Sequence, residues 1–459
     1  MLYSQIINVL PHRILTSLWT KQETRISLSH LINYDNKNEQ PAAITSNFLC
    51  NELPIRYTHI LRLLSTLSPE TLKSPIIRHV AHNYLRDICT LLHPSLKETS
   101  PKAFINVLTD LRQRQSINLI RLKYALLSSS FSSTTNTIQL LENLNTIGTG
   151  IYLLLDQYVS WNFNKNDHVQ PICPEEIAQK AVSDAHDMVS TTLGTSQIPK
   201  IEIIRKNMYT KDTSSFVYIP SVFHRILYET SLLALKAHVF QQQGSSSSPT
   251  KWFSWLFNKS PPKLSMCLFG GPTSIGCRLE TSEPLIERDL LPDIPRDVLG
   301  IPTSASVLST MTQTQGERRR RRRPQQQQQQ QRLLPHTEWM NGWQVAKSLA
   351  NHWGGQLNVV SAEGLGSSLY LSLDRDTSLR EQYPTNSNFI RGASAELLRH
   401  DRRVSAIGFT SVQAATAQLD AFLYAISDHH SPPPPNWHET QQQQPYHHSV
   451  SLMAAVGHA

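Results

Sequence analysis

The chain has 459 residues, of which 39% are hydrophobic, and no stretch of it approaches the roughly 18 consecutive apolar residues of a membrane span. The formal net charge is +8, but six consecutive arginines at residues 318–323 supply most of it. The remaining chain is therefore nearly balanced, and nucleic acid is not the expected partner. The five cysteines are an odd number without CxxC spacing, so neither a disulfide framework nor a zinc site is expected.

The first 22 residues have the composition of a mitochondrial transit peptide. They contain no acidic residue, carry Arg13 and Lys21, and alternate aliphatic with hydroxyl side chains. An amphipathic helix that belongs to the folded protein would share this pattern. The sequence therefore predicts a transit peptide over residues 1–22, with the amphipathic helix as the alternative.

Residues 23–166 carry the apolar spacing of long helices. Apolar side chains recur at intervals of three and four, with few glycines and almost no β-branched alternation. The clearest examples are Ile60, Leu61, Leu64, Leu67, Ile76, Val80, Tyr84, Ile88 and Leu91. Helices that each bury one apolar stripe pack together. The sequence predicts a four-helix bundle here.

Beyond residue 166 the pattern alternates between helix and strand. Residues 200–206 and 215–220 predict two short strands, and the sheet is expected to resume at residues 263–271. Residues 167–375 are therefore predicted to form a second domain, a mixed sheet packed on helices. The predicted fold class of the whole chain is α+β.

The end of this second domain is the clearest element of the sequence. Val345, Leu349 and Trp353 recur at helical spacing, and a Gly-Gly corner follows them. Residues 357–373 then alternate between apolar and polar side chains around a glycine turn, which predicts two antiparallel strands.

Three segments of low complexity interrupt this domain or follow it. The insert near residues 241–262 carries an aromatic cluster that is expected to pack against the parent domain. The insert near residues 312–332 joins the arginine run to polyglutamine and predicts a disordered loop, with nucleic-acid binding as the alternative. Residues 376–459 form a tail, largely disordered after residue 428, whose scattered histidines are held by no regular element.

Several short motifs follow one another along the chain. A Glu-Leu-Pro-hydrophobic-Arg signature occupies residues 52–56, and an Arg-x-Arg segment occupies residues 112–114. A long helical segment ends at Gln157, and residues 338–374 form the helix, glycine corner and hairpin described above. Over about residues 20–375, this order resembles the mitochondrial pyruvate and branched-chain 2-oxoacid dehydrogenase kinases. The chain is identified as a divergent member of that family.

The resemblance implies a histidine-kinase-like ATPase domain that uses ATP and magnesium to phosphorylate serine. In the family, the substrate is the decarboxylating subunit of the dehydrogenase, the lipoyl domain of the complex is the docking partner, and the location is the mitochondrial matrix. A homodimer, or a heterodimer with an active relative, is also implied. The Asp-Trp element that locks dimers in some members is not evident after residue 375.

The family places its catalytic base and a metal ligand on one helix, as His, Glu and Asn spaced four residues apart. Aligned through residues 218–221, this chain carries Arg225, Glu229 and Leu233 at those positions. The resemblance makes Glu229 the catalytic base, although an arginine one turn away would pair with it and weaken its basicity. Leucine offers no oxygen to magnesium, so no metal ligand is predicted. His224 lies one position early and would reach Glu229 only if the helix rotated.

The nucleotide contacts implied by the resemblance are Gly270, Gly342, Gly364, Gly366 and Ser367. Leu268 takes the place of the aspartate that binds adenine in the family, and Gln115 takes the place of a histidine. ATP and magnesium are therefore implied by the family but placed in doubt by these residues.

Two functions stay open. The chain is either a divergent but active protein-serine kinase or a catalytically inactive pseudokinase that regulates an active relative or its docking site. The inserts also leave open a faulty gene model. The sequence does not distinguish which dehydrogenase is served or which oligomer is formed.

Overall fold

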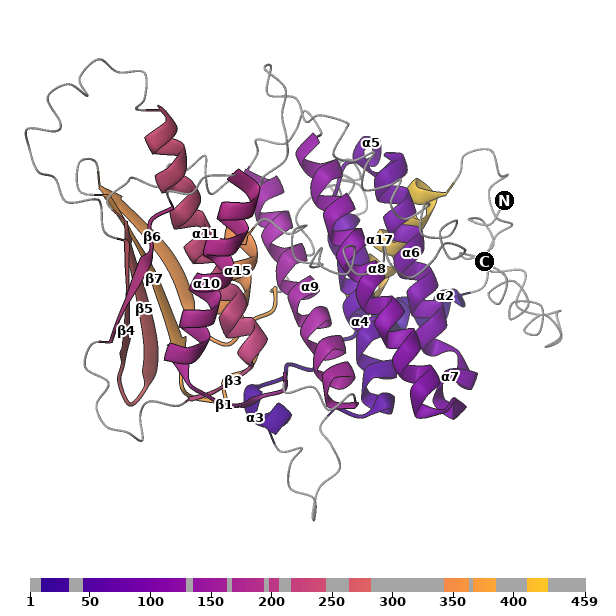
Figure 1. Cartoon of the computed structure of the whole chain (residues 1–459). Coiled ribbons are helices and arrows are strands. Elements are labelled where there is room, and N and C mark those ends of the chain that lie inside the picture. The colour runs from indigo at the N-terminus through magenta and orange to yellow at the C-terminus, as the bar shows by residue number, and fades with distance from the viewer. Residues whose placement is uncertain are drawn as a thin grey trace, which may run out of the picture.

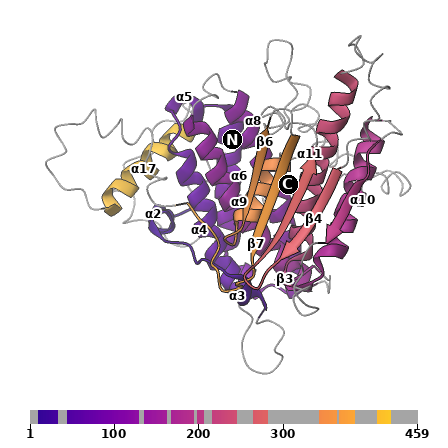
Figure 2. The ribbon, with the colours of Figure 1, turned by 90° about the vertical axis from the view of Figure 1, so that its left-hand side faces the viewer.

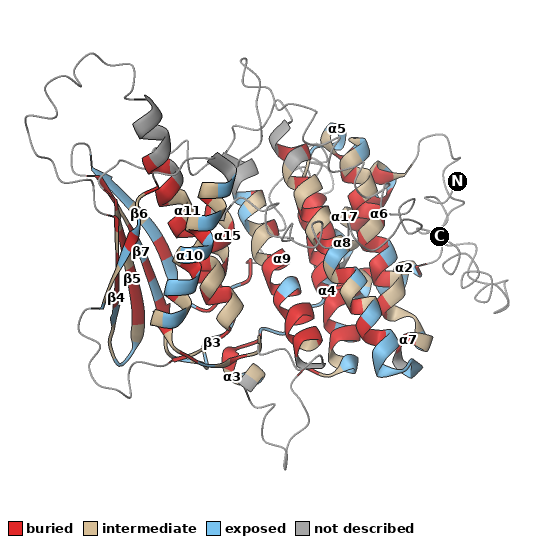
Figure 3. Ribbon diagram, in the orientation of Figure 1, coloured by how far each residue is buried: buried red, intermediate tan, exposed pale blue. Residues whose placement is uncertain are grey.

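The computed structural model describes most of the chain between residues 10 and 427 (Figure 1). The described residues are 10–32, 44–128, 135–162, 167–193, 198–205, 216–244, 264–281, 342–362, 366–384 and 411–427. They form two hydrophobic cores, one among helices and one between a sheet and the helices that cover it. Buried residues line the inner faces of both parts (Figure 3).

The first core lies among long helices of the N-terminal part. These are α4 (Ser46–Leu64), α6 (Pro75–Leu92), α8 (Pro101–Ser128) and α9 (Thr135–Asn162), with the shorter α2 (His12–Thr20), α3 (Leu28–Ile32), α5 (Pro69–Leu72) and α7 (Pro94–Glu98). Helix α4 packs against α6, α6 against α8, α8 against α9, and α9 against α4. Thr45 caps α4 by accepting a 3.1 Å hydrogen bond from the Phe48 amide, which satisfies one free donor of the first turn.

The second core lies under a mixed sheet of five strands in the order β2, β4, β5, β7, β6. The strands are β2 (Ile201–Arg205), β4 (Leu264–Gly270), β5 (Ser274–Thr281), β6 (Gln356–Ala362) and β7 (Gly366–Asp374). Strands β2 and β4 are parallel, and the other neighbours are antiparallel. A separate antiparallel pair joins β1 (Gln170–Ile172) to β3 (Phe216–Tyr218).

Three helices cover one face of this sheet and separate it from the first core. They are α10 (Pro174–Leu193), α11 (Pro220–Gly244) and α15 (Gly342–Asn351). Figure 2 looks onto the strands, and these helices lie behind them. Leu369, Leu371 and Leu373 of β7 are buried on the helix side, whereas Tyr370 between them is exposed on the other side. This alternation is what a sheet covered on one face requires.

The predicted α+β class with a mixed sheet is confirmed, while the four-helix bundle, the histidine-kinase-like ATPase type and the domain boundaries stay predictions. Residues 245–262 of the first insert, the whole second insert and the tail after residue 427 lie outside the described residues. None of the described helices is both long and apolar enough to cross a membrane.

The predicted Gly-Gly corner has a steric reason. Gly354 adopts φ +80°, a conformation that favours glycine, in the turn of residues 352–354 that follows α15. A Cβ on Gly355 would lie 2.5 Å from the Ala350 carbonyl oxygen and 2.7 Å from that of Ser372. Only glycine lets β6 start this close to α15 and β7.

Helix α2 and a C-terminal helix, α17 (Ser411–Ile426), pack together on the first core. Trp19 is fully buried, its ring centroid lies 5.9 Å from that of Phe422, and its indole N–H donates to Gln418 Oε1 at 3.3 Å. Residues 12–20 therefore pack into the first core, and the transit peptide over residues 1–22 stays a prediction. Cleavage after residue 22 would remove this helix from the core. No element was predicted at α17.

A buried ionic cluster joins the two parts. Arg56 Nε donates to Glu52 Oε1 at 2.9 Å, and its NH1 donates to Glu381 Oε2 at 3.0 Å. Glu381 Oε1 also accepts the Ile26 amide at 3.0 Å, and His352, after α15, lies 3.3 Å from Glu381 Oε2. Arg56 thus holds the chain that returns from the sheet through Glu381, while Glu52 pairs with Arg56 and accepts the Thr24 amide at 3.0 Å.

Candidate functional site

Helix α11 carries the predicted catalytic residues and runs between the sheet and α9. It packs on α10 and α15, and α15 in turn packs on α9. Helix α11 therefore lies between the sheet and the helices of the first core, and this boundary is called the junction below (Figure 1).

Glu229 lies in this junction with only 7% of its surface exposed. The guanidinium of Arg225, one turn earlier, forms an ion pair with it. Burial lowers the pKa of Arg225, and the charge of Glu229 opposes that effect. The guanidinium also lies 5.6 Å from the centre of the Tyr228 ring. A carboxylate held by a cation in this way is a weaker base than a free one.

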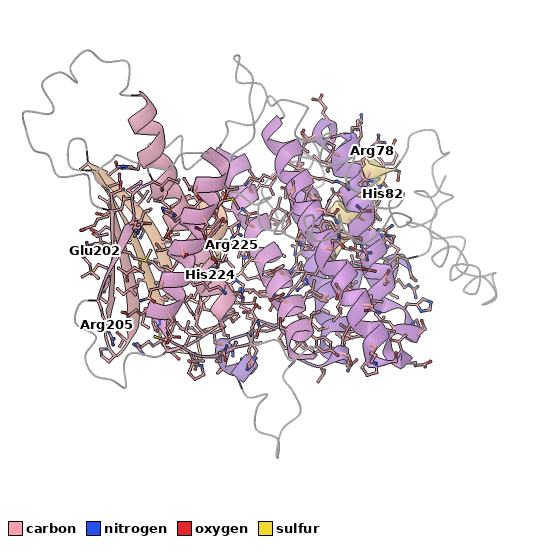
Figure 4. All side chains as sticks on the ribbon, viewed as in Figure 1. Arg78, His82, Glu202, Arg205, His224 and Arg225 are labelled. Carbon is pink, nitrogen blue, oxygen red and sulfur yellow. The ribbon has the colours of Figure 1, made fainter. Side chains whose placement is uncertain are left out.

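Two neighbouring residues of α11 point in different directions. His224 Nε2 donates to Asp184 Oδ2 of α10 at 2.9 Å, whereas Arg225 faces α9, where its charge acts on Tyr152 (Figure 4). Burial lowers the pKa of His224, and the hydrogen bond to Asp184 opposes this. His224 is thus engaged with α10 and does not replace Arg225 beside Glu229.

Leu233 follows Glu229 by one turn on the same helix face. Its side chain is half-buried and packs against the second core. Within the described ranges, no group of three or more His, Cys, Asp and Glu side chains could hold a metal ion. Leu233 therefore offers no oxygen ligand on this face, and no step of the chemistry is assigned to a metal here.

Two of the predicted nucleotide contacts start β7. Gly366 adopts φ +98°, and Ser367 Oγ donates to Ser361 Oγ at 2.8 Å. Ser367 lies opposite Thr281 at the end of β5. Gly342 starts α15. A tight corner joins the last turn of α15 to the first residue of β6, so the helix and the strand run in opposite directions. Gly342 therefore lies near the end of the sheet where β6 finishes and β7 begins. Gly364 lies outside the described residues.

Gly270 lies at the opposite end of the sheet. It pairs with Ile275, which pairs with Leu373 of β7, and Ser367 is roughly 20 Å from Leu373 along that strand. The structure therefore does not bring Gly270 together with the other predicted contacts.

Leu268 is fully buried in the second core, opposite Cys277 in the middle of β5. Ser367 pairs with Thr281 instead, four residues or about 13 Å farther along β5. The sequence could not show this, because only the pairing of β5 with β7 fixes which strand end meets Ser367.

The Arg-x-Arg segment of residues 112–114 also contributes a side chain to the junction. Arg112 of α8 forms an ion pair with Asp156 of α9, and the charges of both act on Tyr152. Gln115 is almost fully buried between the helices of the first core, away from the junction. No sequence signal marked Tyr152 or Asp156, because their roles depend on how α8, α9 and α11 pack.

Comparisons with known proteins bear on this arrangement. Residues 25–188 match the profile of a family described as mitochondrial branched-chain alpha-ketoacid dehydrogenase kinase. The chain is also similar to a protein of Arabidopsis thaliana named pyruvate dehydrogenase (acetyl-transferring) kinase, mitochondrial. The two are 22% identical over 380 residues, which cover 79% of this chain and 93% of the relative.

Proposed function

Because the chain belongs to the family of mitochondrial 2-oxoacid dehydrogenase kinases, we propose that it is a protein-serine kinase. Its donor is ATP, and its substrate is the decarboxylating subunit of a 2-oxoacid dehydrogenase. The observation that carries the proposal is the position of Glu229, a buried carboxylate on the helix between the two cores. An acceptor hydroxyl needs a nearby base in order to attack phosphate.

In the proposed reaction, Glu229 accepts the proton of the serine hydroxyl. Arg225 holds the carboxylate before substrate binds, so the base becomes fully effective only when this ion pair is loosened. ATP supplies the phosphoryl group. The nucleotide is expected at the end of the sheet where Gly366, Ser367 and Thr281 meet.

The wider setting of the proposed kinase follows from the family. We place it in the mitochondrial matrix, docked through the lipoyl domain of the dehydrogenase complex. A homodimer or a heterodimer with an active relative is part of the same proposal. The relative from Arabidopsis, which is named a mitochondrial kinase, supports the mitochondrial location.

A second candidate is a non-catalytic regulator that occupies the docking site of an active relative. Two observations favour it: Glu229 is already paired with Arg225, and Leu233 presents hydrocarbon on the same helix face. Such a protein would keep the fold and its docking surfaces without moving phosphate.

The melting temperature in the presence of ATP separates the two candidates. A kinase that binds ATP at 100 times its Kd gains about 2.7 kcal/mol of stability, which raises the melting temperature by several degrees. A regulator without a nucleotide site shows no such shift. The comparison is made with and without magnesium, and with GTP as the control for nonspecific nucleotide effects.

A further inference from the structure

Helix α11 begins without a capping side chain of its own. The residue before it is Ile219, which is hydrocarbon, and its first residue is Pro220. Its first turn carries no acidic residue either. A helix start leaves free N–H donors and partial positive charge that a side-chain oxygen normally satisfies.

Asp167 supplies the missing cap from far along the chain. The Ser221 amide donates to Asp167 Oδ1 at 3.0 Å, across 54 positions of sequence. A carboxylate at this place satisfies one of the free donors and complements the helix dipole. The start of α11 is therefore fixed by a residue outside the helix.

Gln157 holds Asp167 in turn. The Gln157 side-chain amide donates to the Asp167 carbonyl oxygen at 3.1 Å, and Gln157 is itself buried near the end of α9. Two hydrogen bonds thus connect α9 to the start of α11. Farther along α11, the charge of Arg225 acts on Tyr152 of α9.

Glu229 lies about 12 Å along α11 from Ser221. A shift of the helix start relative to α9 would therefore move Glu229 relative to the junction that it faces. If Asp167 only fixed the segment that follows α9, the hydrogen bond from Gln157 to its backbone carbonyl would be enough. The Asp167 carboxylate also accepts the Ser221 amide, and this second hydrogen bond connects the segment to α11.

We propose that Gln157 and Asp167 are positioning residues, through which the helical part sets the place of α11 and hence of Glu229. Neither touches the reacting atoms. The catalytic consequence rests on the proposed kinase function, whereas the mechanical coupling does not.

Hydrogen–deuterium exchange of the full-length protein tests the coupling directly. Asp167→Ala should speed exchange over residues 221–226 about fivefold, the factor that corresponds to a typical N-cap. Asp167→Asn keeps an acceptor oxygen and should stay near the wild-type rate. Asp184→Ala, which removes the partner of His224 on the same helix, is the matched control and should leave residues 221–223 unchanged.

Gln157→Leu tests whether α9 acts through Asp167. Gln157→Leu should speed exchange over residues 221–226. The double variant Gln157→Leu/Asp167→Ala should exchange no faster than Asp167→Ala alone. Unchanged exchange in Asp167→Ala, or fully additive effects in the double variant, would overturn the coupling. If Asp167→Ala fails to fold, the comparison of Asp167→Asn with Gln157→Leu decides the question in the same way.

Phosphate transfer tests the catalytic part. Asp167→Ala should lower kcat about fivefold with an unchanged KM for ATP, and Asp167→Asn should restore it. Equal kcat in all three proteins would contradict positioning. A wild-type protein that transfers no phosphate would contradict the proposed function instead, and the exchange experiment would still decide the coupling.

Discussion

Arg56 and Glu381 are 325 positions apart in the chain, yet their side chains form an ion pair that is closed to solvent. Arg56 is 0% exposed and Glu381 is 3% exposed. A Cβ on Gly150 of α9 would lie 2.6 Å from the Arg56 guanidinium, so α9 closes over the pair. The helical part and the chain that leaves the sheet therefore meet at one buried charge cluster.

Glu381→Gln should destabilise the protein strongly. The variant leaves Arg56 buried without its main counter-charge, and loss of one partner of a buried ion pair costs about 3–5 kcal/mol. Urea unfolding measures the change. Glu280→Gln is the control, because the Glu280 pair with Arg278 is partly exposed to solvent and its loss should cost at most about 1 kcal/mol. Equal urea midpoints of unfolding for the two variants would contradict a stabilising role of the buried Arg56–Glu381 cluster.

Acid should destabilise the protein through His59. Burial lowers the pKa of His59 to about 4, from an ordinary value of 6.5. Its Nε2 donates to the Lys21 carbonyl at 2.9 Å, and its Nδ1 accepts the Tyr383 hydroxyl at 2.8 Å, so the neutral ring fits the site. Between these two pKa values the unfolded chain binds the proton and the folded chain does not.

The contribution of His59 to the free energy of unfolding is thus complete above pH 6.5. It is lost as the pH falls toward 4, for a total of about 3 kcal/mol. Urea unfolding between pH 7 and pH 4.5 measures it. His59→Gln should be less stable at pH 7 and show a flatter profile over this range. A variant profile as steep as that of the wild type would exclude His59 as the cause.

Trp19→Ala should test whether α2 belongs to the folded protein. Trp19 is fully buried against Phe422, and truncation of a buried tryptophan costs about 3–5 kcal/mol. Ile14→Ala on the same helix is the control, since Ile14 is 42% exposed and should cost no more than about 0.5 kcal/mol. If both variants melt at the wild-type temperature, α2 does not contribute to the stability of the folded protein.

Leu233→Asn should create an oxygen ligand one turn from Glu229. The two side chains share a helix face, so the variant offers magnesium a carboxylate and an amide oxygen together. We expect a magnesium-dependent shift of melting temperature with ATP that exceeds the wild-type shift. Leu232→Asn, also half-buried but about 100° around the helix, is the matched control. Equal shifts in both variants would argue against a metal position on this face.

The sequence predicted elements that depend on local patterns. Helix α15 with Val345 and Leu349, the corner at Gly354 and the alternation of β7 all follow from spacing and from the properties of glycine. Helix α17 was missed because its buried residues, such as Phe422, find their partner in α2 at the other end of the chain.

In the candidate site, too, the sequence predicted the local features but not those that depend on long-range packing. Glu229, Arg225 and their ion pair could be expected from a spacing of four residues on one helix. The separation of Gly270 from Ser367 could not, because strand pairing across the sheet decides which ends meet. The contact of Asp167 with α11 likewise needs the packing of α9 against its neighbours.

The most direct test of the central claim is transfer of labelled phosphate from ATP to a serine of the purified decarboxylating subunit. Wild-type protein and Glu202→Gln, which alters an exposed residue of β2, should transfer phosphate at the same rate. Glu229→Gln should be slower by at least about 100-fold, because the proton of serine then has no acceptor. Equal transfer by Glu229→Gln, or no transfer by the wild type, would contradict a kinase that acts through Glu229.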